Sequence, residues 1–152
     1  MLPAAPFFPV FTAPEGWKTE PSGPKLWVTP PEPGARIVIP PVLAKKNWLD
    51  AKELLERTLL EELRSFPKVK RTDTRPIQSA SGIKGFFAEI AGLEAGGAVN
   101  EWRSYVAYDD DPRLYLMFLQ AKPARFVAVR PAFLAVASSV ISGAVSWSEK
   151  KS

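Results

Sequence analysis

Two Ser-x-x-Lys patterns, Ser22 to Lys25 and Ser81 to Lys84, are the first candidates for chemistry in this sequence. In serine acyl-enzymes this spacing at a helix start lets the lysine take the proton of the serine hydroxyl. Both patterns here fall in segments rich in turn residues, and neither opens a predicted helix. The strand–turn–helix context that the chemistry needs is therefore missing, and we assign neither serine a catalytic role.

Carboxylates offer two further candidates, an acid–base pair and a metal-binding loop. Glu89 and Glu101 lie in adjacent predicted strands, and paired carboxylates can perform acid–base chemistry. The predicted register puts them on opposite faces, where Glu101 shares a face with Arg103, so a surface ion pair is favoured. The run from Asp109 to Pro112 offers oxygen ligands for calcium or magnesium, but it lacks the spaced ligands of a calcium loop and joins two predicted strands. We interpret it as a turn.

A basic cluster and a set of aromatic residues could bind single-stranded nucleic acid through phosphate contacts and base stacking. The net charge of +4 is a mild excess, however, and is spread along the chain. We expect the charges to solvate an edge strand and the aromatic residues to fill the core. The basic residues are Lys45, Lys46, Lys68, Lys70, Arg71 and Arg75, and the aromatic residues are Phe86, Phe87, Trp102 and Tyr105.

Histidine and cysteine are both absent from the 152 residues. The first absence excludes Ser-His-Asp, Cys-His and histidine–metal chemistry. The second excludes thiolate nucleophiles, disulfides and cysteine-ligated metals. We therefore predict a non-enzyme, with no catalytic, cofactor-binding or metal-binding residue and no cofactor.

Prolines divide the chain, because 11 of the 16 lie in the first 41 residues. Within that section the segment 26–41, LWVTPPEPGARIVIPP, runs twice from β-branched residues into a Pro-Pro pair. Pro30 to Pro33 fits the P-x-x-P pattern of SH3 ligands. The flanks are strand formers, however, and proline is tolerated at strand ends, so the segment predicts a hairpin inside the fold.

The clearest predicted element is a helix that follows this hairpin. Asn47, with Asp50 three residues later, is typical of a helix start, and Pro67 ends the helix. Glu53 and Arg57 form a favourable i,i+4 pair on the outer face. An apolar stripe at helical spacing faces the core: Trp48, Ala51, Leu55, Leu59, Leu63 and Phe66.

Four strands and a final helix complete the predicted order. The strands cover 69–81, 85–96, 98–110 and 113–121, and Gly96-Gly97 predicts a two-residue hairpin turn. That turn would put Phe87, Glu89 and Ala91 on one face with Trp102, Ser104 and Val106. The last helix is predicted to begin at Pro131 and to reach Trp147. This uncharged stretch could anchor the chain in a membrane, but its four serines, glycine and proline favour a helix packed on a sheet.

These elements predict an α+β fold, an α/β/α sandwich around a mostly antiparallel sheet of about six strands. The long helix after the N-terminal hairpin and the C-terminal helix would cover the two faces. Residues 1–12 are predicted to form an apolar N-terminal arm, 13–147 a single domain and 148–152 a polar tail.

Several of these segments, taken together, resemble the bacterial PsbP-like family over residues 10–142. They are APEGW, LWVTPP, RIVIPP, LDAKELLERTLLEEL and RLYLMFLQAKPARFVAVRPAFLAVASSV. The resemblance implies a fold shared with the extrinsic protein of the photosynthetic oxygen-evolving complex and with a Ran-binding nuclear transport factor. Exported bacterial lipoproteins and chaperones of type VI secretion effectors look similar too. What it implies is a tendency to bind other proteins without catalysis, and it carries over no functional residue.

The leading hypothesis is therefore a non-enzymatic, PsbP-like adaptor that binds another protein. One alternative is a secretion-effector chaperone whose sheet holds an apolar helical client. Another is a small-ligand-binding protein or a carboxylate-dependent hydrolase. We expect no nucleic-acid partner and no membrane insertion. The sequence as it stands has neither a signal peptide nor a lipobox cysteine, which predicts a cytoplasmic location if the chain is complete and a periplasmic or envelope location if a leader was removed.

Overall fold

The computed structural model describes residues 7–46, 49–64, 66 and 68–147. Asn47, Trp48 and Pro67, which the helix prediction used, lie outside the described residues, as do residues 1–6 of the predicted arm and the tail 148–152. The elements are β1 (Phe7–Val10), β2 (Lys18–Ser22), β3 (Lys25–Thr29), β4 (Ala35–Ile39), β5 (Leu43–Ala44), α1 (Ala51–Leu63), β6 (Lys68–Arg71), β7 (Arg75–Gln78), β8 (Lys84–Leu93), β9 (Val99–Asp110), β10 (Arg113–Ala121), α2 (Pro123–Ser138) and β11 (Ile141–Ser146).

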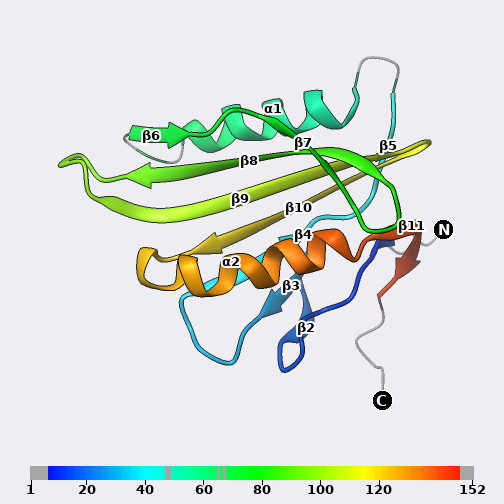
Figure 1. Cartoon of the computed structure of the whole chain (residues 1–152), viewed down its shortest axis with the longest axis horizontal. Coiled ribbons are helices and arrows are strands. Elements are labelled where there is room, and N and C mark those ends of the chain that lie inside the picture. Colours follow the sequence, from blue (N-terminus) through cyan, green and yellow to red (C-terminus); the bar gives the residue numbers. More distant parts are fainter. Residues whose placement is uncertain (1–6, 47–48, 65, 67, 148–152) are drawn as a thin grey trace.

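One antiparallel sheet organises the molecule, with strand order β2-β3-β4-β10-β9-β8-β6. Strand β5 also pairs with β10, and β7 pairs with β8, which makes nine strands rather than the six or so expected. Helix α1 lies over one face and α2 over the other, so the predicted α+β sandwich is confirmed (Figure 1). One of the three extra strands arises because the predicted strand 69–81 divides into β6 and β7, and the other two are the short strands β2 and β5.

The proline-flanked segment forms the predicted hairpin. Strands β3 and β4 pair antiparallel, with Trp27 opposite Val38. Strand β3 ends at Thr29 and β4 at Ile39, so each Pro-Pro pair follows the last residue of its strand. Strand β1 pairs with β11 in a separate two-stranded sheet, and its Phe8 side chain is buried in the core.

Helix α1 has the predicted apolar stripe, but it begins at Ala51, later than the start predicted at Asn47. Asp50 is the N-cap, and its side chain accepts a hydrogen bond of 2.8 Å from the Glu53 backbone N–H. Asp50 serves as the N-cap because its carboxylate reaches the free backbone N–H groups of the first turn. Ala51, Leu55 and Leu59 are fully buried against the sheet.

The β8–β9 hairpin has the predicted register with a different turn. Phe87 pairs with Val106, Glu89 with Ser104 and Ala91 with Trp102. The connecting loop spans residues 94–98 instead of two glycines, and the register shifts beside Gly92. The longer loop would by itself change the strand register, but an extra residue in β9 beside Gly92 restores it. The predicted faces are therefore correct although the predicted turn is wrong.

The C-terminal prediction is wrong in its boundaries. Helix α2 begins at Pro123, not Pro131, and 141–146 is strand β11 rather than the end of a helix. Both prolines can open a helix, and Pro131 is tolerated inside α2 because the carbonyl that it leaves unpaired belongs to Val127, which is 82% exposed to water. No helix in the described part of the chain is long and apolar enough to span a membrane.

Candidate functional site

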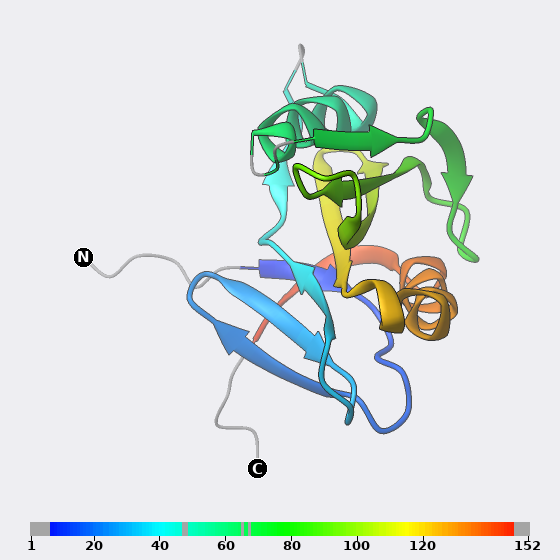
Figure 2. The ribbon, with the colours of Figure 1, turned by 90° about the vertical axis from the view of Figure 1, so that its left-hand side faces the viewer.

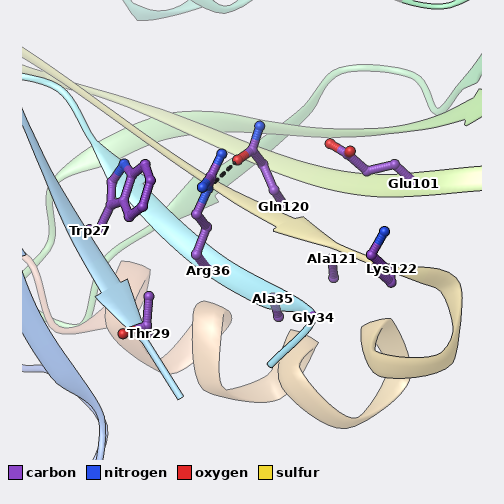
Figure 3. A pocket seen from close by; sticks show the side chains of 9 residues that line it. All are labelled: Trp27, Thr29, Gly34, Ala35, Arg36, Glu101, Gln120, Ala121 and Lys122. Carbon is purple, nitrogen blue, oxygen red and sulfur yellow. Dashed lines mark hydrogen bonds between the residues drawn. The ribbon is translucent and has the colours of Figure 1, made fainter. Parts of the chain in front are cut away.

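Helix α1 covers only part of its face of the sheet. Its contacts are with β8, β9 and, more weakly, β10, whereas β3 and β4 continue past it (Figure 2). A hollow of about 330 Å³ lies where the helix ends. We call it the β4–β10 hollow (Figure 3), and it is lined by Trp27, Thr29, Gly34, Ala35, Arg36, Glu101, Gln120, Ala121 and Lys122.

Three side chains from three adjacent strands form the centre of the hollow. Arg36 of β4 lies directly opposite Gln120 of β10, and its Nε–H donates a hydrogen bond of 2.7 Å to Gln120 Oε1. The Arg36 guanidinium also stacks over the ring of Trp27 of β3, 4.0 Å from its centroid. The two contacts hold the guanidinium between Trp27 and Gln120, which reduces its conformational freedom (Figure 3).

A charged group separates this hollow from α1. Arg103 of β9 contacts the carboxylates of Glu101 and Glu62, and Glu62 lies in the last turns of α1. The Glu101–Arg103 pair that the sequence predicted is therefore confirmed, although it is half-buried and shared with a third residue. Burial raises the pKa of the Glu101 carboxyl, while the positive charges of Arg36 and Lys122 oppose that rise.

The rim of the hollow is formed by the loop before β4 and the start of α2. The Lys122 backbone N–H donates a 2.8 Å hydrogen bond to the Gly34 carbonyl, which ties the two segments together. Gly34 has φ +102, and a Cβ there would lie 2.9 Å from Cγ of Arg125, so glycine suits this close approach. Arg125 in turn pairs with Glu32 of the loop at 3.5 Å.

Lys122 is an unusual residue for its position. It is the N-cap of α2, makes no side-chain capping hydrogen bond, and no acidic residue follows it in the first turn. A helix N-terminus carries a partial positive charge and is normally matched by an acceptor or an acid. The field of the helix therefore adds to the Lys122 charge at the rim.

The opposite face holds the second predicted carboxylate. Glu89 accepts hydrogen bonds from Ser104 Oγ at 2.6 Å and from Arg130 of α2 at 2.6 and 3.1 Å. The structure thus puts Glu89 and Glu101 on different faces, as the register predicted. Every oxygen of Glu89 has a donor, so this group ties α2 to the sheet.

The other candidate residues are dispersed and have structural contacts. Ser81 Oγ donates to the Val140 carbonyl at 2.9 Å, and Ser22 pairs with Lys25 across the turn between β2 and β3. The aspartate run is a turn, as predicted: Asp111 and Pro112 connect β9 to β10. Asp109 contacts the start of α1 and pairs with Lys45 at 3.2 Å. Among the described residues, no group of acidic side chains could hold a metal ion.

The six candidate basic residues do not form a single cluster. Lys68 pairs with Leu93 at one end of β8, whereas Lys45 lies by Asp109, which pairs with Lys84 at the other end. A strand of this length separates them by about 30 Å. Lys68, Lys70 and Arg71 do lie on the edge strand β6, as predicted, and the aromatic residues face the two cores.

The residues of the hollow were missed because they come from distant parts of the chain. Arg36 and Gln120 are 84 positions apart, and only the pairing of β4 with β10 makes them neighbours. One indication was available in the sequence: Gln120 is a polar residue near the end of a mainly apolar strand.

Comparison with solved structures identifies the architecture. The solution structure of cyanobacterial PsbP (CyanoP) from Synechocystis matches with a TM-score of 0.64 and 16% identity, over 88% of this chain and 85% of that one. The chain has a PsbP-like fold. The crystal structure of PA94, a protein of unknown function from Pseudomonas aeruginosa, matches with a TM-score of 0.55 and 14% identity, over 84% of this chain and 98% of that one. At these identities the PsbP-like likeness establishes the fold alone. No family model and no curated protein matches the sequence.

Proposed function

We propose that this PsbP-like domain is a non-enzymatic adaptor that binds a segment of another protein in the β4–β10 hollow. The observation that carries the proposal is the open part of the sheet beyond α1. Arg36 is held there against Trp27, and none of the described residues of α1 lines the hollow. An aromatic residue and an arginine that are pre-positioned by their neighbours are the residue types that dominate protein interfaces.

The chemistry of the hollow supports binding rather than catalysis. Its carboxylate, Glu101, is engaged by Arg103. Its other polar side chains are the amide of Gln120, the cations Arg36 and Lys122, the hydroxyl of Thr29 and the indole of Trp27. These groups can recognise a polar segment, but they do not include a nucleophile beside a base. A lining of this kind also suits a polar segment better than the apolar helical client of a chaperone.

Site-specific photo-crosslinking in cells that produce the full chain tests this proposal. A photoreactive phenylalanine analogue at Thr29, which lines the hollow, should crosslink to a discrete protein. The same analogue at Val127, which is 82% exposed on α2, is the matched control and should not give that product.

A second variant makes the assignment specific. Trp27→Ala in the Thr29-labelled chain should reduce the crosslinked product, because Arg36 loses the ring on which it stacks. Circular dichroism confirms that this variant is folded. Equal yields from positions 29 and 127, or a product that the Trp27 substitution leaves unchanged, would refute binding in the hollow.

A further inference from the structure

We propose that the β4–β10 hollow recognises an acidic segment of the partner, with an Asp or Glu carboxylate bound to the guanidinium of Arg36. The inference rests on the proposed adaptor function and names the chemistry of its partner. Three features of the hollow carry it: an arginine with free donors, an adjacent amide that presents further donors, and positive charge left over after the local carboxylate is paired.

The first feature is the guanidinium of Arg36. Its Nε–H is used by Gln120 and its face by Trp27. The two Nη groups have no hydrogen-bond or ion-pair partner among the residues that the structure describes. Paired N–H groups in this fork match the two oxygens of a carboxylate, and the stacked, hydrogen-bonded arrangement lowers the entropy cost of binding.

The second feature is the orientation of the Gln120 amide. Because Arg36 Nε–H can only donate, the amide must turn its oxygen toward Arg36 and its NH₂ away from it. That NH₂ has no acceptor among the residues that the structure describes. A carboxylate seated on Arg36 would therefore find a neutral donor beside the charged one.

The third feature is the balance of charge. Three cations, Arg36, Arg103 and Lys122, stand beside two carboxylates, Glu62 and Glu101, and both carboxylates are in contact with Arg103. Arg36 and Lys122 are left without an ion-pair partner within the described ranges. The uncapped N-terminus of α2 at Lys122 adds a partial positive charge of its own.

The same charges favour a protein segment over a nucleic acid. A phosphate backbone needs a continuous basic track, whereas Lys68 and Lys45 lie at opposite ends of β8. Glu101 in the hollow and the exposed Glu32 at its rim would repel a chain of phosphates. A short segment in which carboxylates alternate with neutral residues can place one carboxylate on Arg36 and keep the others away from Glu101 and Glu32.

Nuclear magnetic resonance titration of the full, ¹⁵N-labelled chain tests the inference directly. The probe is a blocked peptide, acetyl-Glu-Leu-Glu-Leu-Glu-amide, and its matched control carries Gln at every Glu position. The acidic peptide should shift the Arg36 Nε–H, Gln120 side-chain and Trp27 indole resonances with saturation. The Gln peptide should leave them unchanged.

Two substitutions and a control localise the effect. Arg36→Gln removes the fork, and Arg36→Lys keeps the charge but loses the paired donors; each should weaken peptide binding about tenfold or more. Arg75→Gln makes the same charge change on β7, outside the hollow, and should retain the affinity of the unmodified chain. Well-dispersed spectra show that each variant is folded.

The outcomes separate the inference from the adaptor function. Equal shifts from both peptides would refute recognition of a carboxylate by Arg36. This result would not affect the adaptor function, which Thr29 crosslinking tests separately. Saturation of the same resonances by inorganic phosphate, with displacement of the peptide, would also overturn it, because the site would then be one for free anions. Loss of Thr29 crosslinking with acidic-peptide binding retained would refute the adaptor function instead.

Discussion

Glu89 and Glu101 lie on neighbouring strands but on opposite faces of the sheet, and each is neutralised by a different arginine. Arg130 of α2 binds Glu89, and Arg103 of β9 binds Glu101. The first pair fastens a helix to the sheet, whereas the second lines the hollow where α1 ends. Two carboxylates that could have formed an acid–base pair therefore serve separate layers of the sandwich.

The Glu89–Arg130 pair should matter more for stability than an exposed ion pair. Arg130→Leu leaves a carboxylate that is 11% exposed with Ser104 as its remaining donor. We expect a loss of about 2–3 kcal/mol in the free energy of unfolding, below the range for fully buried pairs because Arg130 is partly solvated. Urea denaturation measures it.

The double variant Glu89→Leu/Arg130→Leu should recover part of this loss, because no buried charge is then left unpaired. Lys18→Ala, in the exposed Lys18–Glu20 pair of 3.0 Å, is the control and should change the stability by less than about 1 kcal/mol. A double variant as unstable as Arg130→Leu would show that packing, not the unpaired carboxylate, causes the loss.

Gly85 should tolerate no side chain. A Cβ at this position would lie 2.1 Å from the Ala107 carbonyl oxygen and 2.7 Å from Cδ1 of Tyr108, so β8 could not keep its distance from β9. Gly85→Ala should cost about 3 kcal/mol or more. Gly96→Ala is the matched control, since nothing lies within 4 Å of its Cβ, and should change stability by less than about 0.5 kcal/mol. Thermal denaturation of the two variants would contradict this expectation if their midpoints were equal.

All three tyrosines should resist ionisation in the folded protein. Burial raises the pKa of Tyr108 to about 12, and it raises those of Tyr105 and Tyr115 as well. Tyr108 donates its hydroxyl proton to the Ala137 carbonyl at 2.6 Å, an interaction that only the neutral phenol can make. Because the fold favours neutral phenols, the stability they contribute is complete below the unfolded pKa of about 10 and is lost as the pH rises toward 12.

Phenolate absorbance measures this resistance. The native protein should show no phenolate signal at about pH 10, where the guanidinium-unfolded chain is half ionised. Tyrosine ionisation and loss of circular dichroism should then coincide at higher pH. A native titration with a midpoint near that of the unfolded chain would show that these side chains are exposed to solvent.

Periodic sequence patterns correctly predicted which face of a single helix or strand is buried. The stripe of Ala51, Leu55 and Leu59 gave α1 its buried face, and the alternation around Phe87 and Glu89 gave the correct β8–β9 faces. Both predictions worked because burial acts on every second residue of a strand and on one side of a helix.

The C-terminal region could not be predicted in the same way. Pro123 and Pro131 are equally good first residues of a helix, and small residues after Ser138 fit either a helix or a strand. Residues 141–146 form a strand because they pair with β1, more than a hundred positions earlier in the chain, and because Gly143 adopts φ +129. The hollow escaped prediction for the same reason, since Trp27, Arg36 and Gln120 meet only through strand pairing.

Lys122 allows the proposed binding site to be separated from the stability of the fold. An aspartate at this N-cap could accept hydrogen bonds from the first turn of α2 and would match the helix dipole, because the backbone is already extended with φ −67 and ψ 153. Lys122→Asp should therefore raise the free energy of unfolding by about 1 kcal/mol while it weakens binding of the acidic peptide. Asp50→Ala, which removes the working cap of α1, should lower stability by a similar amount and leave peptide binding unchanged. Urea denaturation and the peptide titration, applied to both variants, check the two effects independently. If the Lys122→Asp variant were less stable than the unmodified chain, Lys122 would be a residue that stabilises the fold. The idea that it lowers stability in exchange for binding would then be wrong.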